Sequence, residues 1–223
     1  MSSARPLRIP ASRHKHDAGP AIERLGIDSS HAVLDLGCGD GHHSRAILQH
    51  APERLVNLDV SLEQLRELAE RPDEAPSPAH VCADALALPF RAASFDRVIC
   101  SLVFYLLPLE RALGELHRLL IPGGRAYVRV PMLAAGRAME IFRGAAGAGG
   151  RLYAASHVFN GVFFAIAGHQ IRSPFVRHDR WACYVPRRRF EEAVVREGFR
   201  IETLEIDYPR PRTPSIEAWL VKE

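Results

Sequence analysis

The sequence has little lysine, no closely spaced pair of cysteines and no long uninterrupted hydrophobic run. Its four cysteines never stand in a CxxC spacing, which argues against a zinc ribbon or a disulfide scaffold, and no metal site is predicted. Residues 152–168 are the most apolar run, but His157 and Asn160 interrupt it and it is too short for a membrane span. The polar, basic start contains no signal-peptide core, so we expect a cytoplasmic protein.

The composition is that of an ordinary globular domain. The chain has 223 residues, of which 47% are hydrophobic and 25% charged. This length supports one sizeable core but not two full domains, and a disordered chain would have fewer apolar residues and a larger net charge. We therefore predict one folded domain over residues 19–223, preceded by an N-terminal arm over residues 1–18.

The net charge of +3 is unevenly distributed along the chain. All but two of the 29 basic residues are arginines, a bias that a GC-rich genome explains. Met1–His16 carries four basic and no acidic residues, whereas Asp17–Val130 has a net charge of −5. Pro131–Phe190 has a net charge of +7, and Glu191–Glu223 has −3. The excess positive charge therefore belongs to the arm and to the segment after residue 130.

Between residues 30 and 130, short runs rich in branched apolar residues alternate with longer helical patterns. Repeated strand–helix units of this kind predict a parallel sheet in an α/β domain. The predicted strands are Ala32–Leu36, Leu55–Val60, His80–Ala83, Arg97–Ser101 and Arg125–Val130. The predicted helices are Gly41–His50, Leu62–Glu70 and Leu109–Leu120, and the last of these is expected to end at Pro122–Gly124 before the fifth strand begins.

After Pro131 the regular alternation breaks. The sequence favours a helix over Met132–Arg143, a hinge over the small residues Gly144–Gly150, and a second helix over Arg151–Gln170 that is apolar on nearly every side. A further helix (Arg187–Glu197) and two strands (Arg200–Ile206 and Ser215–Val221) are expected to close the domain. We therefore predict an insertion over residues 131–183, called the lid segment below.

The first predicted strand runs into the glycine-rich sequence VLDLGCGDG at residues 33–41. Glycines at 37, 39 and 41 allow a tight turn and close approach of the backbone to a ligand at a helix N-terminus. A dinucleotide-binding GxGxxG motif would need glycine at position 42, where this chain has His42. Asp35 stands two residues before the first glycine. By itself this loop is weak evidence for any one ligand.

Further motifs follow at the ends of the next strands. Asp59 ends the second strand, where a carboxylate can accept hydrogen bonds from both hydroxyls of a ribose, and Asp84 ends the third, where it can accept from an exocyclic amine. Together, VLDLGCGDG, DVS, DALALPF, SFDRVICS and ERALGELHRLLIPGGRAYV resemble the class I S-adenosylmethionine-dependent methyltransferases, especially the small branch with the ubiquinone and menaquinone methyltransferases. The resemblance covers residues 20–130 closely and 184–223 more loosely.

The resemblance implies a Rossmann-like sheet of seven strands, the last antiparallel, with helices on both faces and S-adenosylmethionine across the carboxyl ends of strands one to four. By the same resemblance, Asp35 orients the loop, Asp59 binds the ribose and Asp84 the adenine amine. Ser101 offers its carbonyl to the methionine ammonium group. The full set of cofactor-binding residues implied is Asp35, Gly37, Cys38, Gly39, Asp59, Val60, Gln64, Asp84, Ala85 and Ser101.

The sequence offers several candidates for a catalytic base. Many relatives have a histidine pair just after the fourth strand, whereas this chain has Phe104-Tyr105. Tyr105 therefore takes a position that usually faces the active site, and His157 and His178 of the lid segment are the histidine candidates. His169, His14 and His16 are further candidates, and the reaction can also proceed by positioning the acceptor without a base.

The region after the fifth strand also suggests the class of acceptor. Residues 131–190 hold nine of the 17 aromatic residues and an excess of arginine, which favours a small hydrophobic or aromatic substrate with an anionic group. An RNA methyltransferase is an alternative, but the modest net charge makes nucleic acid an unlikely partner. A regulatory protein that binds the cofactor without turnover also remains open.

Peripheral membrane contact through residues 152–168 is compatible with the sequence, as are a monomer and a homodimer.

Overall fold

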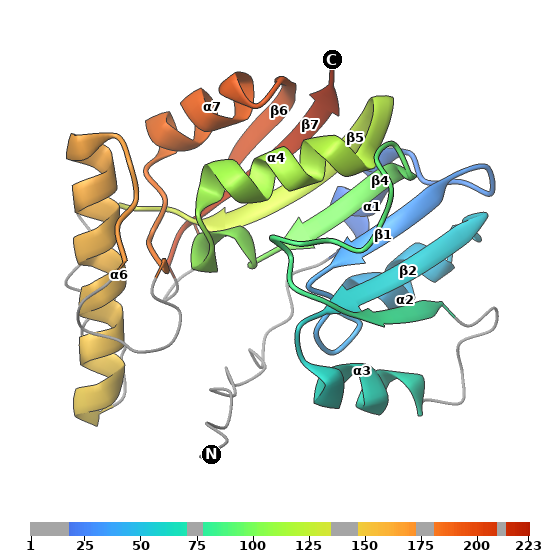
Figure 1. Ribbon diagram of the computed structural model, residues 1–223, viewed down its shortest axis with the longest axis horizontal. Coiled ribbons are helices and arrows are strands. Elements are labelled where there is room, and N and C mark those ends of the chain that lie inside the picture. The colour runs from blue at the N-terminus through green and yellow to red at the C-terminus, as the bar shows by residue number, and fades with distance from the viewer. Residues whose placement is uncertain (1–17, 71–77, 135–146, 173–180, 209–212) are drawn as a thin grey trace.

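The computed structural model describes residues 18–70, 78–134, 147–172, 181–208 and 213–223. Its centre is one seven-stranded sheet with the strand order β3-β2-β1-β4-β5-β7-β6 (Figure 1). The first five strands are parallel to their neighbours, whereas β7 is antiparallel to both β5 and β6. The predicted Rossmann-like sheet with an antiparallel last strand is therefore confirmed.

The elements follow one another with few long connections. In chain order they are α1 (Gly19–Leu25), β1 (Ala32–Leu36), α2 (His42–Leu48), β2 (Arg54–Asp59), α3 (Leu62–Ala69), β3 (Ala79–Cys82), β4 (Phe95–Ser101), the 3-10 helix η1 (Phe104–Leu106), α4 (Leu109–Leu119), β5 (Leu120–Pro131), α6 (Gly147–Ala167), α7 (Arg187–Arg196), β6 (Phe199–Asp207) and β7 (Ser215–Lys222).

Helices cover both faces of the sheet, because each central strand is apolar on both sides. Leu34 and Leu36 point to the face covered by α4 and α7, where they join the larger hydrophobic core. Val33, two residues from Asp35, points to the opposite face and packs with α1 and α2 around Tyr127 and Trp219. This alternation sends Asp35 toward α2, which matters for the site described below.

The positions of the strands were predicted well, and their ends differ for identifiable reasons. The fifth strand was expected to begin at Arg125 after a stop at Pro122–Gly124, but β5 already begins at Leu120. Phe95 pairs with Leu120 and Arg97 with Arg125, so the Pro-Gly-Gly sequence forms an irregularity within the strand rather than a break before it. The helix itself ends at Leu119, one residue before the predicted end, but the prediction of a stop at Pro122–Gly124 ahead of the strand was wrong.

The lid segment differs from its prediction at both ends of α6. Gly147–Gly150 were expected to belong to a hinge, but they form the first turn of α6, so the hinge prediction is wrong for those residues. Met132 forms a β-bridge with Val185, so the predicted helix does not begin at Met132, and its remainder over residues 135–143 lies outside the described part of the chain. In the described residues, no helix is long and apolar enough to cross a membrane.

Close backbone contacts attach α6 to the carboxyl end of the sheet. The Val185 amide donates to Pro131 O at 2.9 Å and the Tyr184 amide donates to His157 O at 3.2 Å, so the strand-like segment before α7 lies between β5 and α6. Gly161 is where this segment comes nearest to the helix, because a Cβ at that position would lie 2.3 Å from Tyr184 O. Figure 1 shows α6 standing beyond the carboxyl ends of the parallel strands.

Gly161→Ala should therefore loosen the docking of α6 without unfolding the sheet. The added methyl group meets backbone rather than a movable side chain, so we expect about 1–3 kcal/mol of local destabilisation. Hydrogen exchange should become faster in α6 and in residues 181–185 and stay unchanged in β1–β5. Val162→Ala, on the exposed side of the same helix, is the matched control. Equal exchange rates in Gly161→Ala and the wild type would contradict this account of the contact.

Candidate functional site

The loop between β1 and α2 turns over the carboxyl end of the neighbouring strand. The amides of Gly37 and Cys38 both donate to Leu58 O of β2, at 2.7 and 3.0 Å. Gly37, Gly39 and Gly41 have φ values of 73°, 52° and 74°, a left-handed conformation that residues with a side chain rarely adopt. A Cβ at Gly37 would also lie 2.2 Å from Val103 Cγ2. The predicted need for glycine in this loop is therefore explained by conformation and by space.

Asp59 fixes the loop to the end of β2. One carboxylate oxygen, Oδ2, accepts a hydrogen bond from the Gly39 amide at 3.0 Å, and the other, Oδ1, accepts from the Ser61 amide at 2.9 Å. The Ser61 hydroxyl in turn caps α3 by accepting from the Gln64 amide at 3.3 Å. A carboxylate has roughly four lone-pair sites, so these two bonds leave it able to accept from the hydroxyls of a ribose.

Asp35 is buried between the sheet and α2. The Ser44 hydroxyl lies 2.7 Å from Asp35 Oδ2 and 3.0 Å from Asn57 Oδ1, and all three side chains are nearly inaccessible. Burial raises the pKa of Asp35 to about 7 against the opposing hydrogen bonds from Ser44, and the nearby Asp59 and Asp40 raise it slightly further. Near neutral pH this carboxyl is therefore poised between its neutral and charged forms.

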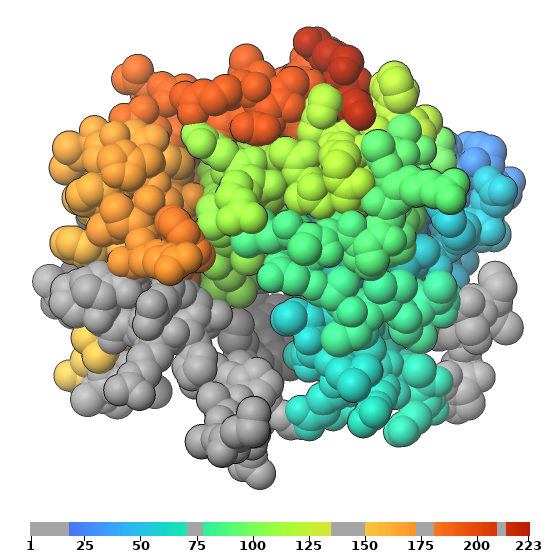
Figure 2. Space-filling view, viewed as in Figure 1, coloured from blue at the N-terminus to red at the C-terminus, as the bar shows by residue number. Residues whose placement is uncertain are grey.

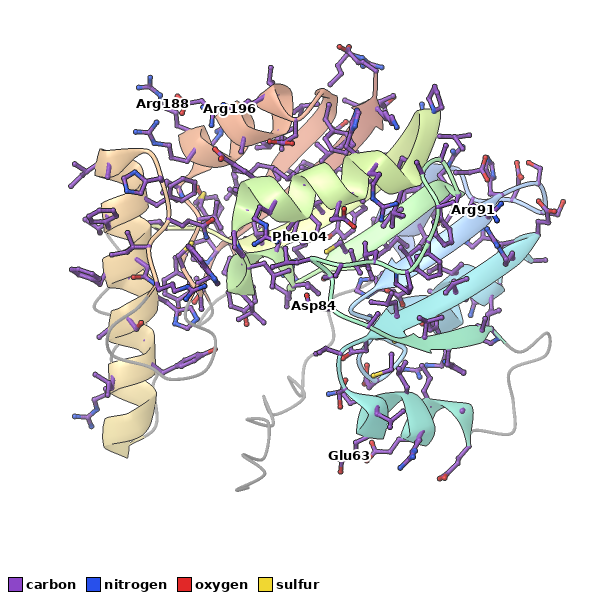
Figure 3. The ribbon with its side chains drawn as sticks, viewed as in Figure 1. Glu63, Asp84, Arg91, Phe104, Arg188 and Arg196 are labelled. Carbon is purple, nitrogen blue, oxygen red and sulfur yellow. The ribbon has the colours of Figure 1, made fainter. Side chains whose placement is uncertain are left out.

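The remaining predicted cofactor residues lie along the same carboxyl edge. Val60 is 76% exposed directly after Asp59, and Gln64 is exposed on α3. Asp84 is exposed after β3, accepts from the Leu86 amide at 2.8 Å, and lies in Figure 3 between Glu63 of α3 and Phe104 of η1. Ala85 follows it and is partly buried.

Ser101 ends β4 at the position facing the glycine loop. The next residue, Leu102, has a φ of 60°, which is uncommon for a residue with a branched side chain, and its side chain is 42% exposed. The Leu102 amide donates to Arg129 O of β5 at 2.9 Å, which holds this turn against the sheet. The chain therefore holds a strained backbone conformation directly after Ser101, of the kind that often accompanies functional sites.

These residues fit S-adenosylmethionine. The glycine loop gives a cradle that side chains would fill, Asp59 retains acceptor capacity for the ribose, and exposed Val60 offers an apolar surface for adenine. Cys38 is buried, and burial raises the pKa of its thiol well above the ordinary range, so it contributes backbone and packing rather than a thiolate. Among the described residues no cluster of acidic, histidine or cysteine side chains could hold a metal ion.

Two of the three catalytic candidates come together. The rings of Tyr105 in η1 and His157 in α6 have centroids 5.9 Å apart, although 52 positions separate them in sequence. The rings of Tyr153 and Tyr184 lie 4.2 and 5.4 Å from the His157 ring, so three tyrosines surround one buried histidine. His178, the third candidate, lies outside the described residues, as do His14 and His16. His169 is exposed.

The hydrogen bond between His157 Nδ1 and the carbonyl oxygen of Tyr153 determines which ring nitrogen of His157 can act as a base. His157 Nδ1 lies 2.8 Å from the carbonyl oxygen of Tyr153, which can only accept, so Nδ1 carries the proton. In the neutral ring Nε2 is then the nitrogen with the lone pair. Nε2 is itself buried from solvent, so an acceptor reaches this nitrogen only when the surrounding rings move.

Gln170 connects the end of α6 to the segment that carries Tyr105. Its Nε2 group donates to Leu107 O at 3.1 Å and contacts Cys183 Sγ at 3.2 Å, while its Oε1 accepts from the Leu109 amide at 2.6 Å. The Cys183 amide also donates to Tyr105 O at 2.9 Å. The relative position of Tyr105 and α6 is therefore set by partly buried hydrogen bonds and not by ring packing alone.

Three residues of the site were not predicted: Ser44 and Asn57, the partners of Asp35, and Gln170. For Asn57 a signal existed, because it is the one polar residue in the otherwise apolar run Leu55–Leu58 of β2, and it pairs in register with Asp35 of β1. Gln170 gives no such signal, because its importance depends on contacts with residues about 60 positions away.

Comparisons with known proteins agree with this geometry. Residues 34–128 match the family model described as a methyltransferase domain. The chain is 32% identical over 111 residues to the 2-phytyl-1,4-naphtoquinone methyltransferase of Thermosynechococcus vestitus, covering 48% of this chain and 49% of that protein. It is 33% identical over 145 residues to the malonyl-[acyl-carrier protein] O-methyltransferase of Pseudescherichia vulneris, covering 65% and 55%. The matched region thus spans about half the length of these curated relatives.

The solved structures agree on the fold. An S-adenosylmethionine-dependent methyltransferase from Methanosarcina mazei superposes with a TM-score of 0.65 at 17% identity, covering 91% of this chain and 97% of that one. At that identity the likeness concerns the fold alone.

The raised pKa of Asp35 predicts how the stability of the protein depends on pH. An unfolded aspartate loses its proton near about pH 4, whereas Asp35 in the folded protein keeps it to about pH 7. Unfolding therefore releases a proton in this window, and the contribution of Asp35 to stability falls as pH rises through it. Relative to the wild type, Asp35→Asn should gain stability between these two pH values and keep a constant difference above them.

Urea unfolding across this pH range measures that difference, with Glu53→Gln, an exposed carboxyl outside the network, as the control. A difference between Asp35→Asn and the wild type that does not change with pH would show that Asp35 does not titrate as described.

Proposed function

Because this chain carries a class I S-adenosylmethionine-dependent methyltransferase domain, we propose that it transfers a methyl group from this cofactor to a small hydrophobic or aromatic acceptor. The observation that carries the cofactor part is the pair of backbone bonds from Gly39 and Ser61 to Asp59, which bring the glycine loop and the end of β2 together. The relatives named as methyltransferases of a naphtoquinone and of a malonyl-carrier protein support a non-nucleic-acid acceptor.

The acceptor is proposed to lie between the carboxyl edge of the sheet and the lid segment. The aromatic rings of Tyr105, Tyr153 and Tyr184 gather on that side and suit a flat, apolar molecule. An anionic group on the acceptor would be attracted by the net charge of +7 over residues 131–190. We propose residues 131–183 as the cover of this acceptor site.

In the proposed in-line displacement at the methyl carbon, different residues bind the cofactor, position the acceptor and accept the proton. When bound, S-adenosylmethionine supplies a methyl group on a sulfonium that leaves as a neutral thioether without acid assistance. Asp59 and the glycine loop hold the cofactor, and Tyr105 with the rings around it holds the acceptor in line with the methyl group. Such positioning alone can lower the activation barrier by about 7–11 kcal/mol. His157 Nε2 accepts the proton that an acceptor hydroxyl loses as its oxygen bonds to the methyl carbon.

Asp59 is the first residue to test. Asp59→Ala removes the acceptor of two backbone bonds and of the proposed ribose contact, and Gly39→Val places a branched side chain in the left-handed loop. Each variant should lose S-adenosylmethionine binding in titration calorimetry while its circular dichroism stays unchanged. Glu53→Ala, at the other end of β2, should bind as the wild type does. Wild-type affinity in both site variants would refute the cofactor assignment.

His157 is tested by turnover. A panel of phenols, naphthoquinols and carboxylic acids with methyl-labelled S-adenosylmethionine identifies an acceptor by the product that gains label. On that acceptor His157→Gln should lower kcat by about 10²–10⁴-fold without weakening cofactor binding, because only the proton acceptor is lost.

His169→Gln, an exposed histidine near the end of the same helix, is the matched control and should keep full activity. If His157→Gln turned over like the wild type at every pH, positioning without a base would replace the proposed mechanism. No labelled product from any acceptor, with intact cofactor binding, would instead favour a regulatory role.

A further inference from the structure

The polarity of α6 differs from that of an ordinary surface helix, because polar residues lie on its buried side beside the apolar Ala154 and Phe164. Its buried face contains Ser156, His157, Asn160 and Gly161, of which the first three are polar and at most 2% exposed. Amphipathic surface helices place such residues toward solvent and their apolar residues toward the core. The inward polar residues serve the site and the contact with residues 182–184. The outward face needs a separate explanation.

The outward face of α6, called the outer stripe below, is apolar along the length of the helix. Leu152, Phe159 and Ile166 repeat every seven residues and are 49%, 45% and 79% exposed, with Val162 between them at 43%. From Leu152 to Ile166 the stripe extends over about 20 Å of the helix. Figures 1 and 2 show α6 at the outermost edge of the molecule. An exposed apolar surface of this extent marks an interaction site.

The charges around the outer stripe indicate what covers it. Arg151 and Arg172 are exposed at its two ends, and within the described parts of the chain neither forms an ion pair. Arg172 stacks on Trp181 at 5.5 Å, which combines a cation and an amphipathic ring at one end. The sequence between Glu140 and Asp179 contains no acidic residue. The stripe is therefore apolar in its middle, with an arginine near each end that forms no ion pair with a described residue.

These charges argue against a second copy of the chain as the partner. Pairing two outer stripes in antiparallel fashion would bring Arg151 of one copy to the end that carries Arg172 of the other, and parallel pairing would join like ends. No acidic residue in this part of the sequence could offset the repulsion. An anionic lipid surface has the complementary properties, because it accepts apolar side chains below a layer of negative headgroups.

We propose that the outer stripe of α6 docks the protein on an anionic membrane surface, with the helix lying in the interface and Arg151 and Arg172 against the headgroups. The docked helix would carry its polar inner face, with His157, toward the catalytic edge of the sheet. Docking requires no turnover, so this proposal and the proposed methyl transfer can fail independently.

Vesicle flotation of the full chain tests the proposal. The wild type should float with phosphatidylcholine vesicles that contain roughly one third phosphatidylglycerol and should bind vesicles of phosphatidylcholine alone much more weakly. Phe159→Glu combined with Ile166→Glu should reduce binding more than about tenfold, because carboxylates replace two apolar side chains of the outer stripe. Arg151→Gln and Arg172→Gln should each reduce binding about fivefold. Val195→Glu, an equally exposed apolar position on α7, should bind like the wild type.

Cofactor binding by calorimetry, measured on each variant, verifies that the folded site is intact. Failure of the wild type to float with the anionic vesicles would overturn the proposal, as would equal loss of binding in Val195→Glu and the outer-stripe variants. Analytical ultracentrifugation supplies the remaining outcome. A dimer that Ile166→Glu converts to a monomer would identify the outer stripe as a self-association surface instead.

Discussion

The constraint on which the site depends is the turn of the chain over the carboxyl end of β2 after β1. The amides of Gly37 and Cys38 both donate to one carbonyl, Leu58 O of β2. Asp59, at the end of the same strand, accepts a hydrogen bond from the Gly39 amide. Parallel strands bring these ends to one edge, and only glycine tolerates both the left-handed backbone and the contact with Val103. These hydrogen bonds therefore fix the shape of the glycine loop over the end of β2, where the cofactor is proposed to bind.

The second half of the site comes from an element that does not belong to the sheet. Tyr105 stands on η1, directly beyond β4, and His157 reaches it from α6. In the proposed mechanism the lid segment supplies the imidazole, because η1 (Phe104–Leu106) offers Tyr105 and no histidine. This role for His157 requires α6 to hold polar residues on its inner side. Gly161 and Gln170 keep the helix in place through contacts with the backbone of neighbouring segments.

Sequence patterns predicted the strands of the sheet, because each strand is recognisable from a short apolar run of neighbouring residues. Alternating apolar runs located every strand, and the positions of Asp35, Asp59 and Asp84 at the ends of successive strands were enough to assign them to one edge of the sheet. The contacts of α6 could not be predicted in this way. An almost uniformly apolar helix has no periodicity from which to read its inner face, so only the folded chain reveals that His157 is inside and Ile166 outside. The pKa of Asp35 likewise depends on tertiary structure, because burial in the folded chain raises it and Ser44 of α2 opposes that rise.

The central claim is that the glycine loop, the end of β2 and the turn after β4 form one site for S-adenosylmethionine. Hydrogen exchange followed by mass spectrometry, with and without saturating S-adenosylhomocysteine, tests this without knowledge of the acceptor. The account predicts slower exchange in residues 37–41, 59–64, 84–86 and 101–105, with no change in β6 and β7. Protection confined to other segments, or none at all under conditions where calorimetry detects binding, would contradict it.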